Sequence, residues 1–240
     1  HKRYQAMSNI TVKYGKGMKM SDMIDADYRL LLLLTRLQFS LGFGDKSVDA
    51  VCQQYGFDTD CFLFLANFQS NKAIMDNVEE RFNQLPLEPF LYYLQCSHDY
   101  FLKNRLPNIR RKLKLIFAEE EKELEELVLD FFDNYMEEVR EHMEYENDTV
   151  FPYVQKLIKS TNKNSYSIDI FEERHNNIEE KMTDLKRILM KYVSGMKDQS
   201  LMVNILMELY MSEEELAAHT FIEDNLVIPR VKSIEKRKEV

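Results

Sequence analysis

The chain has 240 residues, 45% of them hydrophobic, and a net charge of −9. That length accommodates one large domain, or a main domain with a smaller partner. The acidic balance disfavours binding to nucleic acid and to anionic membranes, because like charges repel. Between Ser70 and Val240 the sole glycine is Gly195, which favours long helices over a sheet joined by tight turns.

The ends and the cysteines of the chain carry weaker signals. Residues 1–20 hold five cationic side chains and no acid, and we interpret them as a flexible basic segment. The three cysteines, Cys52, Cys61 and Cys96, are odd in number and lack zinc-site spacing, which predicts reduced thiols in a cytoplasmic protein. The leucine run 30–34 is too short to span a bilayer, and no signal-peptide pattern opens the chain, so we expect no membrane association.

Residues 21–69 are predicted to form a small domain of three helices. Ser21 is expected to cap a helix that runs to about Phe39, and Ser47 a second helix that ends near Gly56. Asp58 or Thr59 is expected to cap a third helix over the string DCFLFLANF. Three short helices occur both in helix-turn-helix DNA-binding domains and in packing modules. The acidic balance of the chain favours a packing module. Residues 70–88 are predicted to be a linker.

Four long amphipathic helices are predicted from Pro89 onwards, at about residues 89–116, 119–158, 168–194 and 198–236. In each of them apolar residues recur every three or four positions, as on one face of a helix. Pro107 and Pro152 are expected to kink their helices or to end a segment. Short connections between long amphipathic helices predict an all-α fold, an antiparallel up-down-up-down four-helix bundle over residues 89–236.

The histidines follow a repeat. His1 is the terminal residue, and the other four fall one on each long helix, at His98, His142, His175 and His219. The first two of these are 44 positions apart, and so are the last two. The strings HMEYENDTVFPYV and HTFIEDNLVIPRV each carry glutamate four residues and proline ten residues after the histidine. We infer a helical hairpin that is present twice, with His on its first helix and His-x-x-x-Glu on its second.

This repeat predicts a metal site with two ions. Residues four apart lie on one helix face, roughly 5–6 Å apart between Cβ atoms, so each His-x-x-x-Glu pair aims its two side chains at one point. Burying carboxylates without a partner is very costly, and metal cations remove that cost. The six predicted ligands are His98, His142, Glu146, His175, His219 and Glu223. Imidazole and carboxylate without thiolate suit iron, with manganese or zinc as alternatives. Bridging carboxylates would leave room for an oxo or hydroxo bridge and for one open position.

Simpler interpretations fit the repeat less well. A lone histidine on an apolar stripe is usually a hydrogen-bonded core residue, and a lone His-x-x-x-Glu is usually a surface ion pair. The recurrence of both patterns in one register on four helices argues against coincidence. Ferritin-like di-iron bundles need Glu-x-x-His on two helices, whereas here only Glu172 and His175 have that spacing.

Several strings resemble a known family. SHDYFLKNRLPNIRRKL, EHMEYENDTVFPYV, FEERHNNIEEKM and HTFIEDNLVIP are similar to the hemerythrin-like cation-binding domain, and more closely to the bacterial RIC family, named for repair of iron centres. The string LGFGDKSVDAVCQQYGFDTDCFLFLANF is similar to the small helical domain in front of the bundle in that family. The resemblance implies that the six predicted ligands hold two non-haem irons, with both carboxylates bridging. It also implies a role in mending iron–sulfur clusters during nitrosative or oxidative stress.

The chain departs from the family patterns in two places. Oxygen-carrying hemerythrins use a fifth histidine on the third helix and an aspartate on the last, where this chain has Glu179 and Glu223. That difference argues against a dedicated oxygen carrier. We interpret Glu179 as a residue that contacts a ligand without binding the metal, or as a surface residue. Many members of the repair family carry adjacent cysteines in the N-terminal domain. This chain has no such pair, which argues against a thiol-dependent step.

Three functional hypotheses follow from these patterns. The first is a redox-active di-iron protein that binds or reacts with nitric oxide or oxygen species, with iron–sulfur proteins as partners. The alternative is a di-iron sensor or binding module whose N-terminal helices contact DNA or a protein partner. The third is a helical interaction protein with an incidental metal. Whether the chain turns over a substrate, donates iron to a partner or forms a homodimer stays open at this stage.

Overall fold

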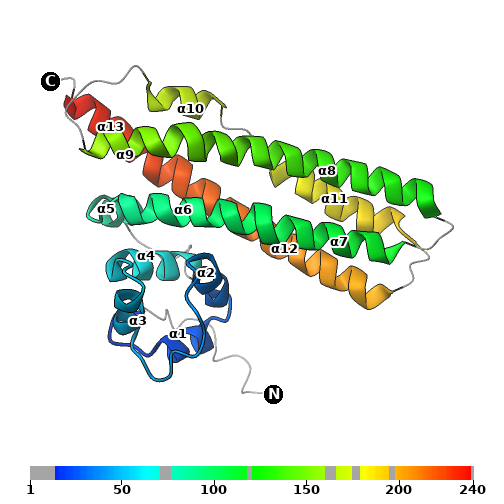
Figure 1. Ribbon diagram of the computed structural model, residues 1–240, viewed down its shortest axis with the longest axis horizontal. Coiled ribbons are helices and arrows are strands. Elements are labelled where there is room, and N and C mark those ends of the chain that lie inside the picture. The colour runs from blue at the N-terminus through cyan, green and yellow to red at the C-terminus, as the bar shows by residue number, and fades with distance from the viewer. Residues whose placement is uncertain are drawn as a thin grey trace. The chain divides into compact units, whose positions relative to one another are not determined.

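A computed structural model describes residues 14–70, 77–117, 121–159, 166–174, 179–194 and 198–238 of the chain. Their regular secondary structure is helical, apart from an isolated antiparallel bridge between Lys19 and Ser47 (Figure 1). The prediction of an all-α fold is therefore confirmed. The chain divides into two compact units, His1–Tyr93 and Leu94–Val240.

The first unit is built from short helices. In chain order they are α1 (Met20–Ala26), α2 (Leu30–Arg36), α3 (Val48–Gln54), α4 (Thr59–Ser70), α5 (Val78–Asn83) and the start of α6 (Glu88–Tyr100). Ser47 caps α3 by accepting the N–H of Ala50 at 3.1 Å. Asp58 likewise accepts the N–H of Cys61 at 2.8 Å at the start of α4. Both side chains satisfy N–H groups that a helix cannot pair within itself, as their predicted capping roles require.

The helix expected from Ser21 to about Phe39 is interrupted at Asp27. The Asp27 carboxylate accepts the backbone N–H of Arg29 at 3.0 Å and binds the guanidinium of the same residue at 2.7 Å. This local turn offers the backbone an alternative to helical hydrogen bonds. It therefore separates α1 from α2.

Part of the segment expected to be a linker is a helix, α5. Its Phe82 is fully buried. The Phe82 ring packs against the rings of Phe64 and Phe90, at centroid distances of 5.8 and 4.7 Å. Burying such a ring stabilises the segment by about 1.5–3 kcal/mol, which explains why a polar stretch nevertheless folds.

The cysteines of the first unit are enclosed by the protein. Cys52 and Cys61 are free thiols and fully buried. Burial raises the pKa of Cys52 to about 12, so its thiol stays neutral. Cys61 donates a weak hydrogen bond to the carbonyl of Pro86 at 3.8 Å. Both therefore behave as small core residues.

The second unit consists of four rods, each a run of helical segments. The first rod consists of the part of α6 from Leu94 onwards, η1 (Phe101–Arg105) and α7 (Leu106–Ile116). The second rod consists of α8 (Lys122–Tyr145), η3 (Glu146–Val150) and α9 (Phe151–Lys159). The third rod contains α10 (Ile168–Arg174) and α11 (Glu179–Tyr192), and the fourth is α12 (Gln199–Ile222), η4 (Glu223–Val227) and α13 (Ile228–Lys238). The segments labelled η are π turns, in which the backbone hydrogen bond reaches one residue further than in an α-helix.

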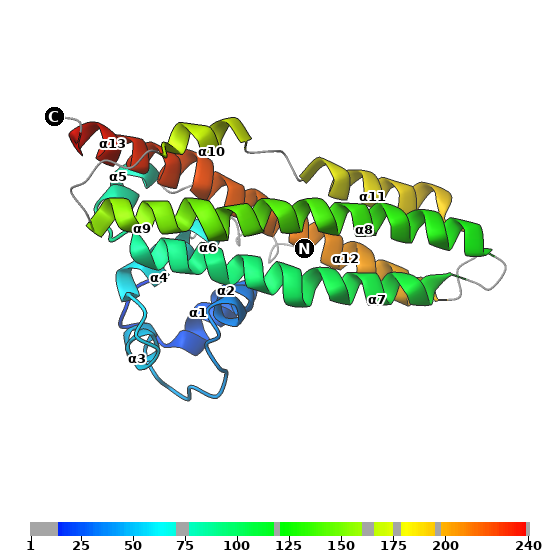
Figure 2. The same cartoon turned by 45° about the horizontal axis from the view of Figure 1, so that its top comes forward.

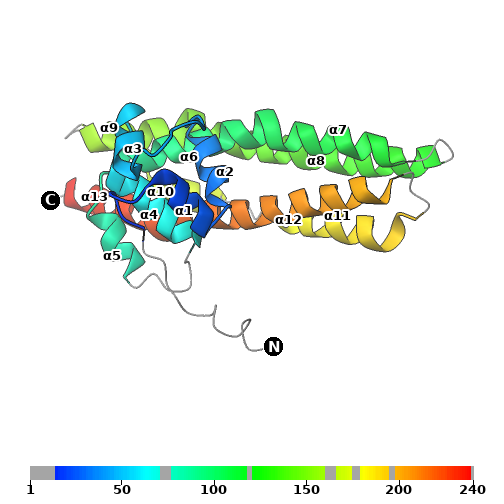
Figure 3. The same cartoon turned by 90° about the horizontal axis from the view of Figure 1, so that it is seen from below.

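Successive rods run in opposite directions and pack as a bundle (Figures 1 and 2). Helix α7 contacts α8 and α12, and α11 contacts the same two helices, so the four close a ring. Figure 3 shows the α7–α8 pair lying over the α11–α12 pair. This arrangement leaves a central space between four helices, which side chains must fill.

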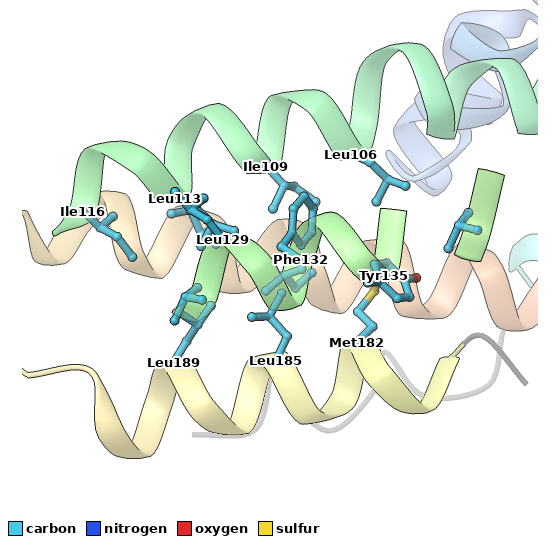
Figure 4. Close-up of a cluster of buried hydrophobic side chains, with 14 of the residues drawn as sticks. Leu106, Ile109, Leu113, Ile116, Leu129, Phe132, Tyr135, Met182, Leu185 and Leu189 are labelled. Carbon is cyan, nitrogen blue, oxygen red and sulfur yellow. The ribbon is translucent and has the colours of Figure 1, made fainter. Parts of the chain in front are cut away.

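One half of that space is filled by apolar side chains. Figure 4 shows Leu106, Ile109, Leu113 and Ile116 of α7 facing residues of α8 and α11, among them Phe132, Tyr135 and Leu185. Helix α12 adds Met202, Ile205, Leu209 and Leu216 to the same cluster. The apolar stripes predicted from helical spacing meet here, and their burial is the main force that holds the bundle together.

Leucine substitutions on α7 test this packing, because Leu113 is fully buried while Leu115, two positions away, is 61% exposed. We expect Leu113→Ala to lower the free energy of unfolding by about 2–5 kcal/mol through lost burial and a residual cavity. Leu115→Ala should change it by less than about 0.5 kcal/mol. Urea denaturation of the full chain measures both. Equal losses from the two substitutions would contradict the assigned core.

Candidate metal site

In the described part of the rods there are three π turns, each one just ahead of a proline. η1 precedes Pro107, η3 precedes Pro152, and η4 precedes Pro229. Proline lacks an N–H, and its ring collides with the carbonyl four residues back in a regular helix. The wider turn relieves this conflict, because the N–H before each proline binds the carbonyl five residues back. The rods thus continue past Pro107 and Pro152, which were expected to kink or end their helices, and past Pro229.

Two of these turns place glutamates at the centre of the bundle. Glu146 is the first residue of η3 and Glu223 the first residue of η4, and both are buried. The histidines predicted to accompany them lie in the preceding helical turn. The Nε2 of His142 lies 2.5 Å from Oε1 of Glu146, and the Nε2 of His219 lies 2.8 Å from Oε1 of Glu223. π turns occur often at functional sites, and here they carry the carboxylates.

A third histidine joins the two pairs from the first rod. The Nε2 of His98, on α6, lies 2.9 Å from Nε2 of His219 and 3.0 Å from Oε2 of Glu146. Oε1 of Glu223 lies 3.9 Å from the same nitrogen. One ligand atom from each of these four residues lies within 4.8 Å of every other. We call His98, His142, Glu146, His219 and Glu223 the His–Glu cluster.

The Glu146 carboxylate lies between imidazoles of two different rods. Its Oε1 faces His142 of its own rod, and its Oε2 faces His98 of the first rod. Each oxygen of one carboxylate is therefore directed at a separate nitrogen donor. A carboxylate placed in this way can join two neighbouring cations or hydrogen-bond two imidazolium groups.

Negative charge dominates the electrostatics of the cluster. Burial by itself lowers the pKa of His98, but the hydrogen bond and charge of Glu146, together with the charge of Glu223, raise that pKa above its usual value. The cluster therefore draws in positive charge, either as protons on imidazole or as a metal cation. His142 is the most exposed of the five, with 12% of its side chain accessible.

The donor set fits a metal cation. Two nitrogens bound to one ion at about 2.1 Å and at right angles lie about 3 Å apart, close to the 2.9 Å between the Nε2 atoms of His98 and His219. Imidazole nitrogen and carboxylate oxygen suit iron and similar transition metals. A cation would also compensate two carboxylates that would otherwise be costly to bury.

The sequence predicted six ligands, and the structure brings five of them together. The sixth, His175, lies outside the described residues, and so does the side chain of Glu179. Two further residues contact the cluster and were not predicted. Oδ1 of Asn147 lies 2.8 Å from Nδ1 of His98, and the Phe151 ring stacks on the His98 ring at a centroid distance of 5.5 Å. Asn147 directly follows Glu146 and Phe151 directly precedes Pro152, but no spacing in the sequence connects either residue with His98.

Comparison with known families assigns the bundle. Residues 100–231 match the family model of the hemerythrin HHE cation binding domain, which covers more than half of the chain. The chain belongs to the hemerythrin HHE cation-binding family. The matched part of this HHE protein includes His142, Glu146, His219 and Glu223, while His98 lies two residues before it and joins the cluster through the fold.

The remaining comparisons give no closer relative. Neither a search of curated proteins nor a search of solved structures finds a match to this HHE chain. Among its described helices, none combines the length and the apolar character needed to cross a membrane.

Removing one carboxylate charge from the HHE cluster tests its role. We expect Glu223→Gln, which keeps the shape of the side chain, to lower metal affinity by at least about tenfold. Substituting a residue that only hydrogen-bonds to a ligand already costs about that much, and Glu223 is itself a predicted ligand. Glu214→Gln is the control, since Glu214 lies on an exposed part of the same helix. Metal analysis after equilibration with limiting ferrous ion measures the difference. Full metal content in Glu223→Gln would contradict the site.

Proposed function

We propose that this HHE domain holds two non-haem iron ions and binds or reacts with nitric oxide and oxygen species. The proposed ligands are His98, His142, Glu146, His175, His219 and Glu223. We further propose that the reaction serves the repair of iron–sulfur centres damaged by nitrosative or oxidative stress, in the cytoplasm, as in the RIC family that the sequence resembles.

The placement of Glu146 is the observation that carries this proposal. One of its oxygens faces His142 and the other faces His98, on a different rod. A site for a single ion would need only one of these directions. Two oxygens aimed at two separate imidazoles support a bridging role between two ions.

The histidines divide between the two proposed ions. The nitrogens of His98 and His219 are close enough to share one ion, with 2.9 Å between them. His142 lies on the other side of Glu146 and would bind the second ion. His175 is the remaining predicted histidine and would join His142 at that ion, and the resemblance implies Glu223 as the second bridge.

The protein groups also prepare the site for a small ligand. Two bound irons would supply redox-active centres that accept a diatomic molecule. The two carboxylates and the imidazoles would hold these ions. His142 is the most exposed member of the cluster, so a small molecule would approach from its side. The buried thiols of Cys52 and Cys61 support a reaction that does not depend on the cysteines of the first unit.

Iron binding and reaction with nitric oxide can be tested on the same sample. The full chain, loaded anaerobically with ferrous ion, should hold about two irons and change its absorption spectrum on titration with nitric oxide. Glu223→Gln should hold fewer irons and give a smaller change, while Glu214→Gln should match the wild type. A wild type that takes up one iron or none would contradict the di-iron proposal.

The repair role needs a separate assay. An iron–sulfur enzyme inactivated by nitric oxide should regain activity faster with the iron-loaded wild type than with the iron-loaded Glu223→Gln variant. Equal recovery with both proteins, or with buffer alone, would contradict a role in repair while leaving iron binding intact.

A further inference from the structure

The His98 ring is held on two sides by one short stretch of the second rod. Oδ1 of Asn147 lies 2.8 Å from Nδ1 of His98. The ring of Phe151 stacks on the imidazole with 5.5 Å between centroids and 16° between planes. Asn147 lies within η3 and Phe151 directly follows it, so the turn that provides Glu146 also clamps a histidine of another rod.

The Asn147 contact determines which nitrogen of His98 is available. An amide oxygen only accepts hydrogen bonds, so Nδ1 of His98 carries the proton and donates it. In the neutral ring, the form that binds a metal, the lone pair then resides on Nε2, the nitrogen that faces Glu146 and His219. His219 lacks such a partner, because its buried Nδ1 has no hydrogen-bond acceptor among the residues that the structure describes.

We infer that Asn147 is a positioning residue of the metal site, which fixes the tautomer and the ring plane of His98 and limits its donor strength. This inference rests on the proposed di-iron function. An acceptor behind a ligating histidine orients it and raises its basicity. A neutral amide does so less than a carboxylate, so Asn147 keeps the ion at His98 easier to reduce than a carboxylate would.

The internal repeat supports a specific role for this position. In the second copy of the repeat the residue directly after the ligand glutamate is Asp224. Both copies therefore place a short side chain with an acceptor oxygen after the glutamate, but with different charge. We therefore expect the two halves of the site to differ in charge at this position, with a neutral amide in the first half and a carboxylate in the second.

Three variants of the iron-loaded full chain test the inference. Asn147→Leu removes the acceptor, and Asn147→Asp keeps it while adding a charge. Asn225→Leu is the control, because Asn225 lies in η4 and its amide binds only the carbonyl of Phe221, at 3.3 Å, among the contacts that the structure describes. Iron affinity and the midpoint potential of the bound iron are measured for each, with circular dichroism to compare folding.

We expect Asn147→Leu to weaken iron binding by about 10- to 100-fold. Asn147→Asp should bind iron as tightly as the wild type and shift the midpoint potential to more negative values, and Asn225→Leu should match the wild type in both. The potential separates a positioning role from a structural one, because Asn147→Asp leaves the hydrogen bond in place.

Two results would overturn the positioning role alone, with wild-type iron binding intact. The first is an Asn147→Leu variant with wild-type affinity, or with the same loss as Asn225→Leu. The second is an unchanged potential in Asn147→Asp, which decides the matter even where Asn147→Leu fails to fold. A wild type that binds no iron would instead overturn both this inference and the proposed function.

Discussion

Two buried carboxylates are the constraint on which the rest of the bundle depends. Glu146 and Glu223 are 0% and 2% exposed. Burying an ionised carboxylate so completely costs free energy unless a nearby positive charge compensates it. Imidazoles surround them, and although burial alone lowers the pKa of His98, the hydrogen bond and charge of Glu146, together with the charge of Glu223, raise it. The cluster is therefore built to retain positive charge, and in an HHE cation-binding domain a metal ion is the natural source of it.

The fold separates packing from chemistry along the length of the bundle. The apolar cluster of α7, α8, α11 and α12 lets the rods pack closely without polar groups. Within one helical turn, the residues that face the bundle centre change from apolar to polar, from Leu216 to His219 on α12 and from Val139 to His142 on α8. Because the packed half fixes the spacing of the rods, the polar half can hold its side chains against their mutual repulsion.

Much of the site could be predicted because its histidines and glutamates recur at fixed intervals in the sequence. His-x-x-x-Glu places both groups on one helix face, and the 44-residue register identifies which histidines belong together. The contact between Asn147 and His98 could not be predicted, since 49 positions separate these residues and no local pattern joins them. The π turns were missed because proline alone indicates a conflict, while the surrounding packing decides how the helix resolves it.

The same contrast holds in the first unit. Ser47 and Asp58 were recognisable as caps, since capping is a local property of the chain. Helix α5 was not, because its stability comes from Phe82 packing on the rings of Phe64 and Phe90, which only the folded chain brings together.

Anomalous diffraction at the iron absorption edge, from crystals of the iron-loaded chain, tests the central claim most directly. The account predicts two iron peaks about 3.5–4 Å apart inside the His–Glu cluster, with one oxygen of Glu146 directed at each. A single peak there, or iron bound only to acidic side chains on the surface, would contradict it.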